Sequence, residues 1–169
     1  MVKEDNFLKN VADFCITKSK NLGCNDVSVL ISNTVTESIN FRNKKLDGLE
    51  RSDNIIIFLT TYLGKRKASI SSTDLKENKV EELVHKCLEA TKITPEDDLN
   101  SLPDAELYFK GSKNLDLYDN TILSNQDKID FIKEAEETAF KDKRIVNTNG
   151  SGFSESKSNV CLANSNGFC

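Results

Sequence analysis

The chain has 169 residues, of which 37% are hydrophobic and 30% are charged. This composition is typical of a globular protein and excludes a disordered chain or a coiled coil. The net charge is -4, so the overall basic surface of a nucleic-acid-binding protein is missing and no direct contact with nucleic acid is expected. No run reaches the roughly 18 apolar residues that span a membrane.

The N-terminal residues and the spacing of the cysteines indicate where the protein resides and whether its thiols are free. The first residues are charged and no apolar signal core follows them. The number of cysteines is odd and no C-x-x-C pair occurs, which predicts neither a disulfide framework nor a zinc knuckle. We therefore expect a cytoplasmic protein with five free thiols, namely Cys15, Cys24, Cys87, Cys161 and Cys169.

Residues 1–93 are predicted to form a domain of helix, β-meander and helix. Apolar residues at helical spacing predict a first helix over residues 6–21. Alternating apolar residues then predict a run of short strands within 26–75, and the most apolar of them, 55–63, should be the central strand. Short turns favour antiparallel order, because parallel strands need long crossovers. The turns are expected at Asn43-Lys44 and Gly64-Lys65.

A second helix should follow this meander. Asp74 is its expected N-cap, with Glu77 three residues on, in the pattern of a capping box. An apolar stripe from Val80 to Thr91 gives the helix one buried face. Both amphipathic helices need an apolar surface, which one face of the sheet supplies.

The remainder is predicted to be a linker, 94–123, and a helix-plus-hairpin lobe, 124–169. The linker contains both prolines and one short strand at 106–109. The third helix should begin near Ser124 and end near Lys141, and its apolar stripe contains Glu136, which is expected to pair with Arg144. A hairpin is expected from 145–154 and 159–164. The predicted fold class is therefore α+β, with an antiparallel β-meander packed by amphipathic helices and followed by this lobe.

No catalytic, cofactor-binding or metal-binding constellation is predicted. His85 is the single histidine, and with Glu81 and Glu89 it makes a poor zinc site, which needs three or four convergent ligands. No H-E-x-x-H motif or G-x-S-x-G elbow occurs. The G-x-G within 149–152 lacks the third glycine and the helix of a phosphate loop, and the acidic cluster at 96–98 lacks the spacing of a calcium loop.

One binding mode follows from the sheet itself. An exposed edge strand can accept an extended peptide through main-chain hydrogen bonds. The sequence leaves open which edge is free, and a neighbouring domain could equally cover it.

Four segments in register resemble the PmbA/TldE branch of the TldD/PmbA family. They are Gly64–Leu75, Leu115–Asp119, Lys143–Gly150 and Ala163–Phe168. The resemblance covers only the N-terminal part of the much longer family chains, which agrees with the expectation that the chain, ending at Cys169 just after a strand, starts a longer protein. The resemblance offers no counterpart of the family's zinc ligands.

The resemblance implies a function. Members of the family, often called modulators of DNA gyrase, resemble a two-subunit zinc protease that degrades unfolded peptides and matures some peptide antibiotics. The TldD-like subunit carries the zinc, and the PmbA/TldE-type subunit lacks the metal ligands. The expectation is a non-catalytic subunit that helps to enclose peptide and pairs with a TldD-like partner. Two alternatives stay open: a catalytic metallopeptidase whose zinc site lies beyond residue 169, and a gyrase-associated regulatory module.

Overall fold

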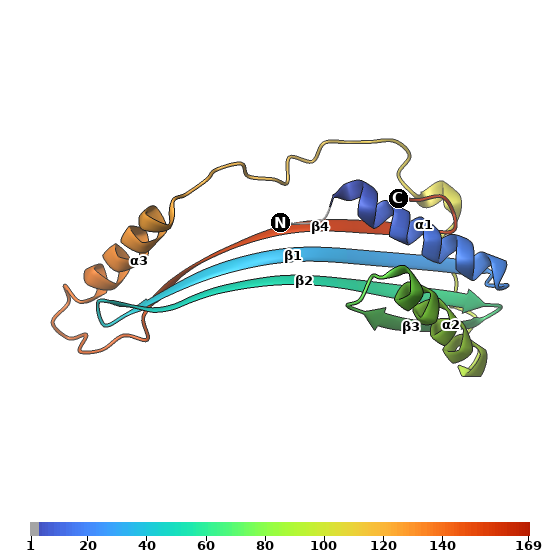
Figure 1. The fold of residues 1–169 in the computed structure, drawn as a ribbon, viewed down its shortest axis with the longest axis horizontal. Helices are drawn as coiled ribbons and strands as arrows, with labels where there is room; N and C mark the ends of the chain where they lie inside the picture. The colour runs from blue at the N-terminus through green and yellow to red at the C-terminus, as the bar shows by residue number, and fades with distance from the viewer. Residues whose placement is uncertain (1–3) are drawn as a thin grey trace. The chain divides into compact units, whose positions relative to one another are not determined.

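The computed structural model describes residues 4–169, and Figure 1 shows its helices and strands. In chain order they are α1 (Asp5–Asn21), β1 (Asp26–Arg42), β2 (Lys45–Leu63), β3 (Arg66–Ser72), α2 (Glu77–Ile93), the short 3-10 helix η1 (Ala105–Leu107), α3 (Asn125–Ala139) and β4 (Ser151–Asn164). The strands form one sheet in the order β3-β2-β1-β4, with antiparallel pairing. The predicted α+β fold with an antiparallel sheet and helices is confirmed.

The meander consists of fewer and longer strands than the sequence predicts. β1 has 17 residues and β2 has 19, where a run of short strands was expected. The strands are longer because the alternation of buried and exposed side chains continues through polar residues. Asn33, for example, is buried within β1, and its side chain donates to the carbonyl of Asn54 at 3.0 Å. The turn at Asn43-Lys44 is confirmed, with φ of 51° and 63°.

The chain divides into two compact units, and β1, β2 and β4 contribute residues to both. The first unit contains the described residues up to Thr34 together with 54–112 and 158–169. The second unit contains 35–53 and 113–157. Each unit has a hydrophobic core of its own.

In the first unit, α1 and α2 cover the alternate residues of the strands that point inward. This core contains Leu8, Cys15, Val29, Ile31, Ile57, Leu59, Val84 and Cys87, all fully buried. One polar pair lies within it: the hydroxyls of Thr61 and Thr91 are 2.6 Å apart. Buried hydroxyls that satisfy each other cost little stability.

The expected helix cap at Asp74 is wrong. α2 begins at Glu77, and its N-cap position is Lys76, which makes no side-chain cap bond. Asp74 instead accepts from the backbone N–H of Lys76 at 3.0 Å, while its own N–H donates to Ser72 Oγ at 3.1 Å. Asp74 therefore forms a local turn that ends before the helix begins.

The segment after α2 contains η1 where a short strand at 106–109 was expected. Its turn is closed by the N–H of Leu107, which donates to the Asp104 carbonyl at 3.0 Å. Arg66 donates to the Lys92 carbonyl at 2.8 Å and pairs with Glu96 at 3.3 Å. Arg66, the first residue of β3, thus holds the start of this segment against the sheet.

In the second unit, α3 begins as predicted. Ser124 and Asp127 form a reciprocal capping box. The core of this unit is small, with Ile39, Phe41 and Ile132 buried and with Ile129 and Phe153 packed against them.

The expected hairpin at the end of the chain is wrong. β4 is a single strand of 14 residues. The serines that looked like a turn lie inside the strand, where Ser156 hydrogen bonds to Thr36 and Ser158 to Thr34, each at 2.9 Å. Among residues 4–169, no helix is long and apolar enough to cross a membrane.

Candidate functional site

One strand edge of the second unit is open. β3 pairs only with Ile57–Leu63 of β2, so among the described residues the stretch 45–53 has no partner strand on that side. Charged residues occur along this edge, namely Lys45, Asp47, Glu50, Arg51 and Asp53. Charges on an edge discourage indiscriminate strand pairing without preventing the addition of a matched peptide.

The opposite edge strand of the sheet is β4, and a turn of the chain lies beside its C-terminal end. The N–H of Ser165 donates to the Val27 carbonyl of β1, whereas the N–H of Asn164 donates to the Phe168 carbonyl, both at 2.9 Å. Because successive N–H groups of a strand point to opposite sides, the turn at 164–168 lies on the outer side of β4. This turn covers only the end of β4, and the stretch 45–53 of β2 is the better candidate for peptide addition because a pocket adjoins it.

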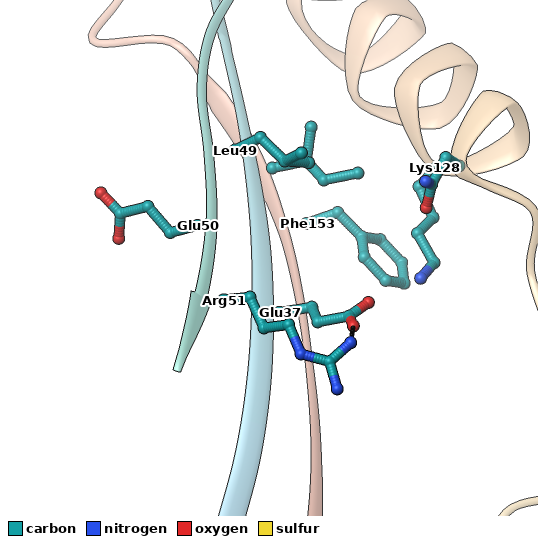
Figure 2. Close-up of a pocket in the computed structure, with 8 residues that line it drawn as sticks. Glu37, Leu49, Glu50, Arg51, Lys128 and Phe153 are labelled. Carbon is teal, nitrogen blue, oxygen red and sulfur yellow. Dashed lines mark hydrogen bonds and ion pairs between the residues drawn. The ribbon is translucent and has the colours of Figure 1, made fainter. Parts of the chain in front are cut away.

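A pocket of about 140 Å³ adjoins this edge within the second unit (Figure 2). β2 contributes Leu49, Glu50 and Arg51, β1 contributes Glu37 and Ile39, α3 contributes Asn125 and Lys128, and β4 contributes Phe153. Figure 2 shows Leu49, Phe153 and Lys128 on one side of β2, with Glu50 directed to the other side. Strand addition beside such a pocket would place a peptide side chain within reach of it.

The two cations that line the pocket, Arg51 and Lys128, are paired with carboxylates. Arg51 Nη1 lies 2.5 Å from Glu37 Oε1. Lys128 Nζ lies 3.0 Å from Glu155 Oε1 and 5.8 Å from the centre of the Phe153 ring. Since both cations are neutralised by carboxylates, the pocket has no unbalanced charge for a free anion. Its apolar contacts, Leu49, Ile39 and Phe153, suit an apolar peptide side chain instead.

Glu136 holds the end of α3 on the turn between β1 and β2. Its carboxylate accepts from the backbone N–H groups of Asn43 and Lys44, each at 2.9 Å, and from Thr148 Oγ1 at 2.8 Å. These bonds, the one from Lys44 foremost, lower the pKa of Glu136 despite its desolvation. The expected partner Arg144 is wrong, because its guanidinium pairs with Asp142 at 2.6 Å.

The pocket residues were not singled out by sequence reasoning. The usable signal was Lys128, which lies four residues before the buried Ile132 and eight before the buried Glu136. A charged residue on the buried face of a helix indicates that its charge is paired within the fold. Both Lys128 and Glu136 lie on the buried face of α3. The distant partners Glu155 and Phe153 have no signal of this kind.

The described residues do not fit a zinc ion. Within 4–169, no group of three or more His, Cys, Asp or Glu side chains converges. His85 is exposed on α2, and its neighbour Glu81 pairs with Lys18 of α1. Gly150 precedes β4 and Gly152 lies within it, so no helix follows these glycines and the geometry of a phosphate loop is missing there.

Comparison with known proteins gives two family matches in order along the chain. Residues 27–93 match the PmbA/TldA metallopeptidase domain 1. Residues 118–169 match the PmbA/TldA metallopeptidase central domain. Together the two matches cover most of the chain, and the second begins within the last residues of the expected linker, 94–123.

Individual relatives agree with these matches. Metalloprotease PmbA of Escherichia coli O157:H7 is 30% identical over 141 residues, which are 83% of this chain and 31% of the relative. A solved structure from Bacteroides thetaiotaomicron, described as a candidate modulator of DNA gyrase, is 29% identical with a TM-score of 0.87, covering 99% of this chain and 38% of that one.

TldE from Thermococcus kodakarensis shares the fold, with a TM-score of 0.64 at 18% identity over 96% of this chain and 35% of that one. The chain spans about a third of the length of the relatives that it matches. The predicted resemblance is thus confirmed, and the chain belongs to the TldD/PmbA family of metallopeptidases as a PmbA/TldE-type protein.

Proposed function

We propose that this chain supplies the first two domains of a non-catalytic PmbA/TldE-type subunit, which acts in the cytoplasm and pairs with a zinc-bearing, TldD-like protease subunit. The observation that carries the proposal is the pair of family matches, domain 1 followed by the central domain.

The proposed role of the chain is to help enclose the peptide substrate. An unfolded peptide would pair with the open stretch 45–53 of β2 and direct an apolar side chain toward Leu49 and Phe153. Main-chain hydrogen bonds would supply affinity for any extended sequence, and the pocket would select the side chain. This combination suits a protease that acts on unfolded peptides.

Two variants of one strand test the peptide site. Leu49 lines the pocket and Leu46 does not, and their exposed fractions of 67% and 53% mean that neither substitution disturbs a core. We expect Leu49→Asp to weaken binding of a fluorescent extended peptide with alternating leucine and serine by about tenfold, equivalent to about 1.4 kcal/mol. Leu46→Asp is the matched control and should bind as the wild type does. Equal affinities of both variants would exclude the pocket, and no binding by the wild type would exclude the site.

The pairing of subunits needs a separate experiment. The immobilised chain should retain a purified TldD-like subunit, and zinc analysis of the whole proposed subunit, purified alone, should find no zinc. Stoichiometric zinc would instead favour a catalytic metallopeptidase. Retention of gyrase without a TldD-like subunit would favour a regulatory module.

A further inference from the structure

The five cysteines of the chain fall into two groups. Cys15, Cys24 and Cys87 are buried in the core of the first unit, with at most 3% of each exposed. Cys161, on β4, is 7% exposed, and Cys169 is exposed. The sulfur atoms of Cys161 and Cys169 are 3.9 Å apart.

A defined turn brings these two thiols together. The N–H of Asn164 donates to the Phe168 carbonyl at 2.9 Å, and the N–H of Gly167 donates to the Asn164 carbonyl at 3.2 Å. Gly167 has φ of +86°, which a residue with a side chain rarely adopts. The ring of Phe168 stacks on Tyr108, with ring centres 5.1 Å apart. The approach of Cys169 to β4 is therefore built into the folded unit.

We propose that Cys161 and Cys169 form a redox-active pair that closes reversibly to a disulfide by exchange with a small-molecule disulfide. The inference is independent of the proposed protease role, because it rests on the geometry of the thiols alone. The other three cysteines are excluded by their burial among apolar side chains, where exchange partners cannot reach them.

The exchange proceeds in two balanced steps. The sulfur of Cys169 attacks the small-molecule disulfide, forming a mixed disulfide and releasing one small thiol, which takes up the proton that Cys169 loses. The sulfur of Cys161 then attacks the Cys169 sulfur, and the second small thiol leaves with the proton from Cys161. The two protein thiols are oxidised by two electrons, and the small disulfide is reduced to two thiols.

The surroundings fix the order of these steps. Burial, followed by the neighbouring Cys169, raises the pKa of Cys161 to about 11. Cys161 is therefore a poor first nucleophile at neutral pH, whereas Cys169 is exposed to solvent. A pocket of about 130 Å³ adjoins both thiols and is lined also by Leu8, Lys9 and Val160, so a small reagent has access to them.

The sequence offers a direct readout of the product. No lysine or arginine lies between Lys157 and Cys169, so trypsin leaves both cysteines on one peptide that begins at Ser158. The native chain is incubated with oxidised glutathione, the remaining thiols are blocked, and the mass of this peptide is measured. Cys161→Ser and Cys169→Ser variants are treated in parallel, with circular dichroism to confirm that they are folded.

Each outcome decides the proposal. In the wild type, the peptide should lose the mass of two hydrogen atoms, and dithiothreitol should restore it. Cys161→Ser should retain one glutathionyl group on Cys169, and Cys169→Ser should remain unmodified. A stable glutathionyl group on the wild-type peptide, a disulfide-linked dimer through Cys169, or equal reactivity of Cys169→Ser and the wild type would each overturn the proposal.

Discussion

We predict that substituting Glu155 lowers the free energy of unfolding more than substituting its ion-pair partner Lys128. The Lys128 side chain is 5% exposed and that of Glu155 is 33% exposed, with 3.0 Å between Nζ and Oε1. Glu155→Gln leaves the ammonium buried and without its counter-charge, so it should destabilise the fold by about 3 kcal/mol, at the lower end for a broken buried pair. Lys128→Met keeps the apolar stem and leaves a carboxylate that water can reach, so it should cost about 1 kcal/mol.

The assay is urea unfolding followed by far-ultraviolet circular dichroism, because the chain contains no tryptophan. The free energy of unfolding follows from the midpoint and the slope. The double variant completes the cycle and should cost little more than Lys128→Met alone, because removing both charges leaves no unpaired ion. Equal costs of the two single variants, or a larger cost for Lys128→Met, would refute the argument from unequal burial.

Three further predictions concern the second unit. Ile132→Ala should lower the free energy of unfolding by about 3 kcal/mol in the same urea assay, because Ile132 is 1% exposed at the centre of a small core. Gly150→Ala should cost about 2 kcal/mol, since φ is +97° and the added Cβ would lie 2.6 Å from the Phe41 carbonyl oxygen; an unchanged unfolding midpoint would contradict this. Glu136 has a lowered pKa, so its contribution is present above its ordinary pKa of 4.5 and is lost as the pH falls below it. The stability difference between the wild type and Glu136→Gln, measured by urea unfolding across pH, should therefore shrink below pH 4.5, and a constant difference would count against the hydrogen bonds from Asn43 and Lys44.

Local signals were sufficient for much of the fold. The capping box of Ser124 and Asp127 fixes the start of α3, because both of its bonds lie within one helical turn. Asn43 and Lys44 adopt positive φ where the sequence predicts a tight turn. Periodicity likewise identified α1, which begins at Asp5 and ends at Asn21, where the prediction was 6–21.

Features that depend on distant partners could not be predicted. Glu136 binds the backbone of Asn43, and backbone N–H groups leave no trace in a sequence. The polar stretch within β4 reads as a turn, although its serines pair with the threonines of β1 more than a hundred residues earlier. The pocket could not be predicted for the same reason, because β1, β2, α3 and β4 each contribute residues to it.

The pairing of β1 with β4 has a consequence for biosynthesis. Thr34 and Ser158, which face each other across the two strands, are 124 residues apart in the chain. At about 5–20 residues per second, the ribosome needs about 6–25 s to deliver β4 after β1 has been made. During that interval the nascent sheet has an unsatisfied edge along β1, on which β4 later settles. An unpaired edge of this kind promotes aggregation of a nascent chain until its partner strand is made.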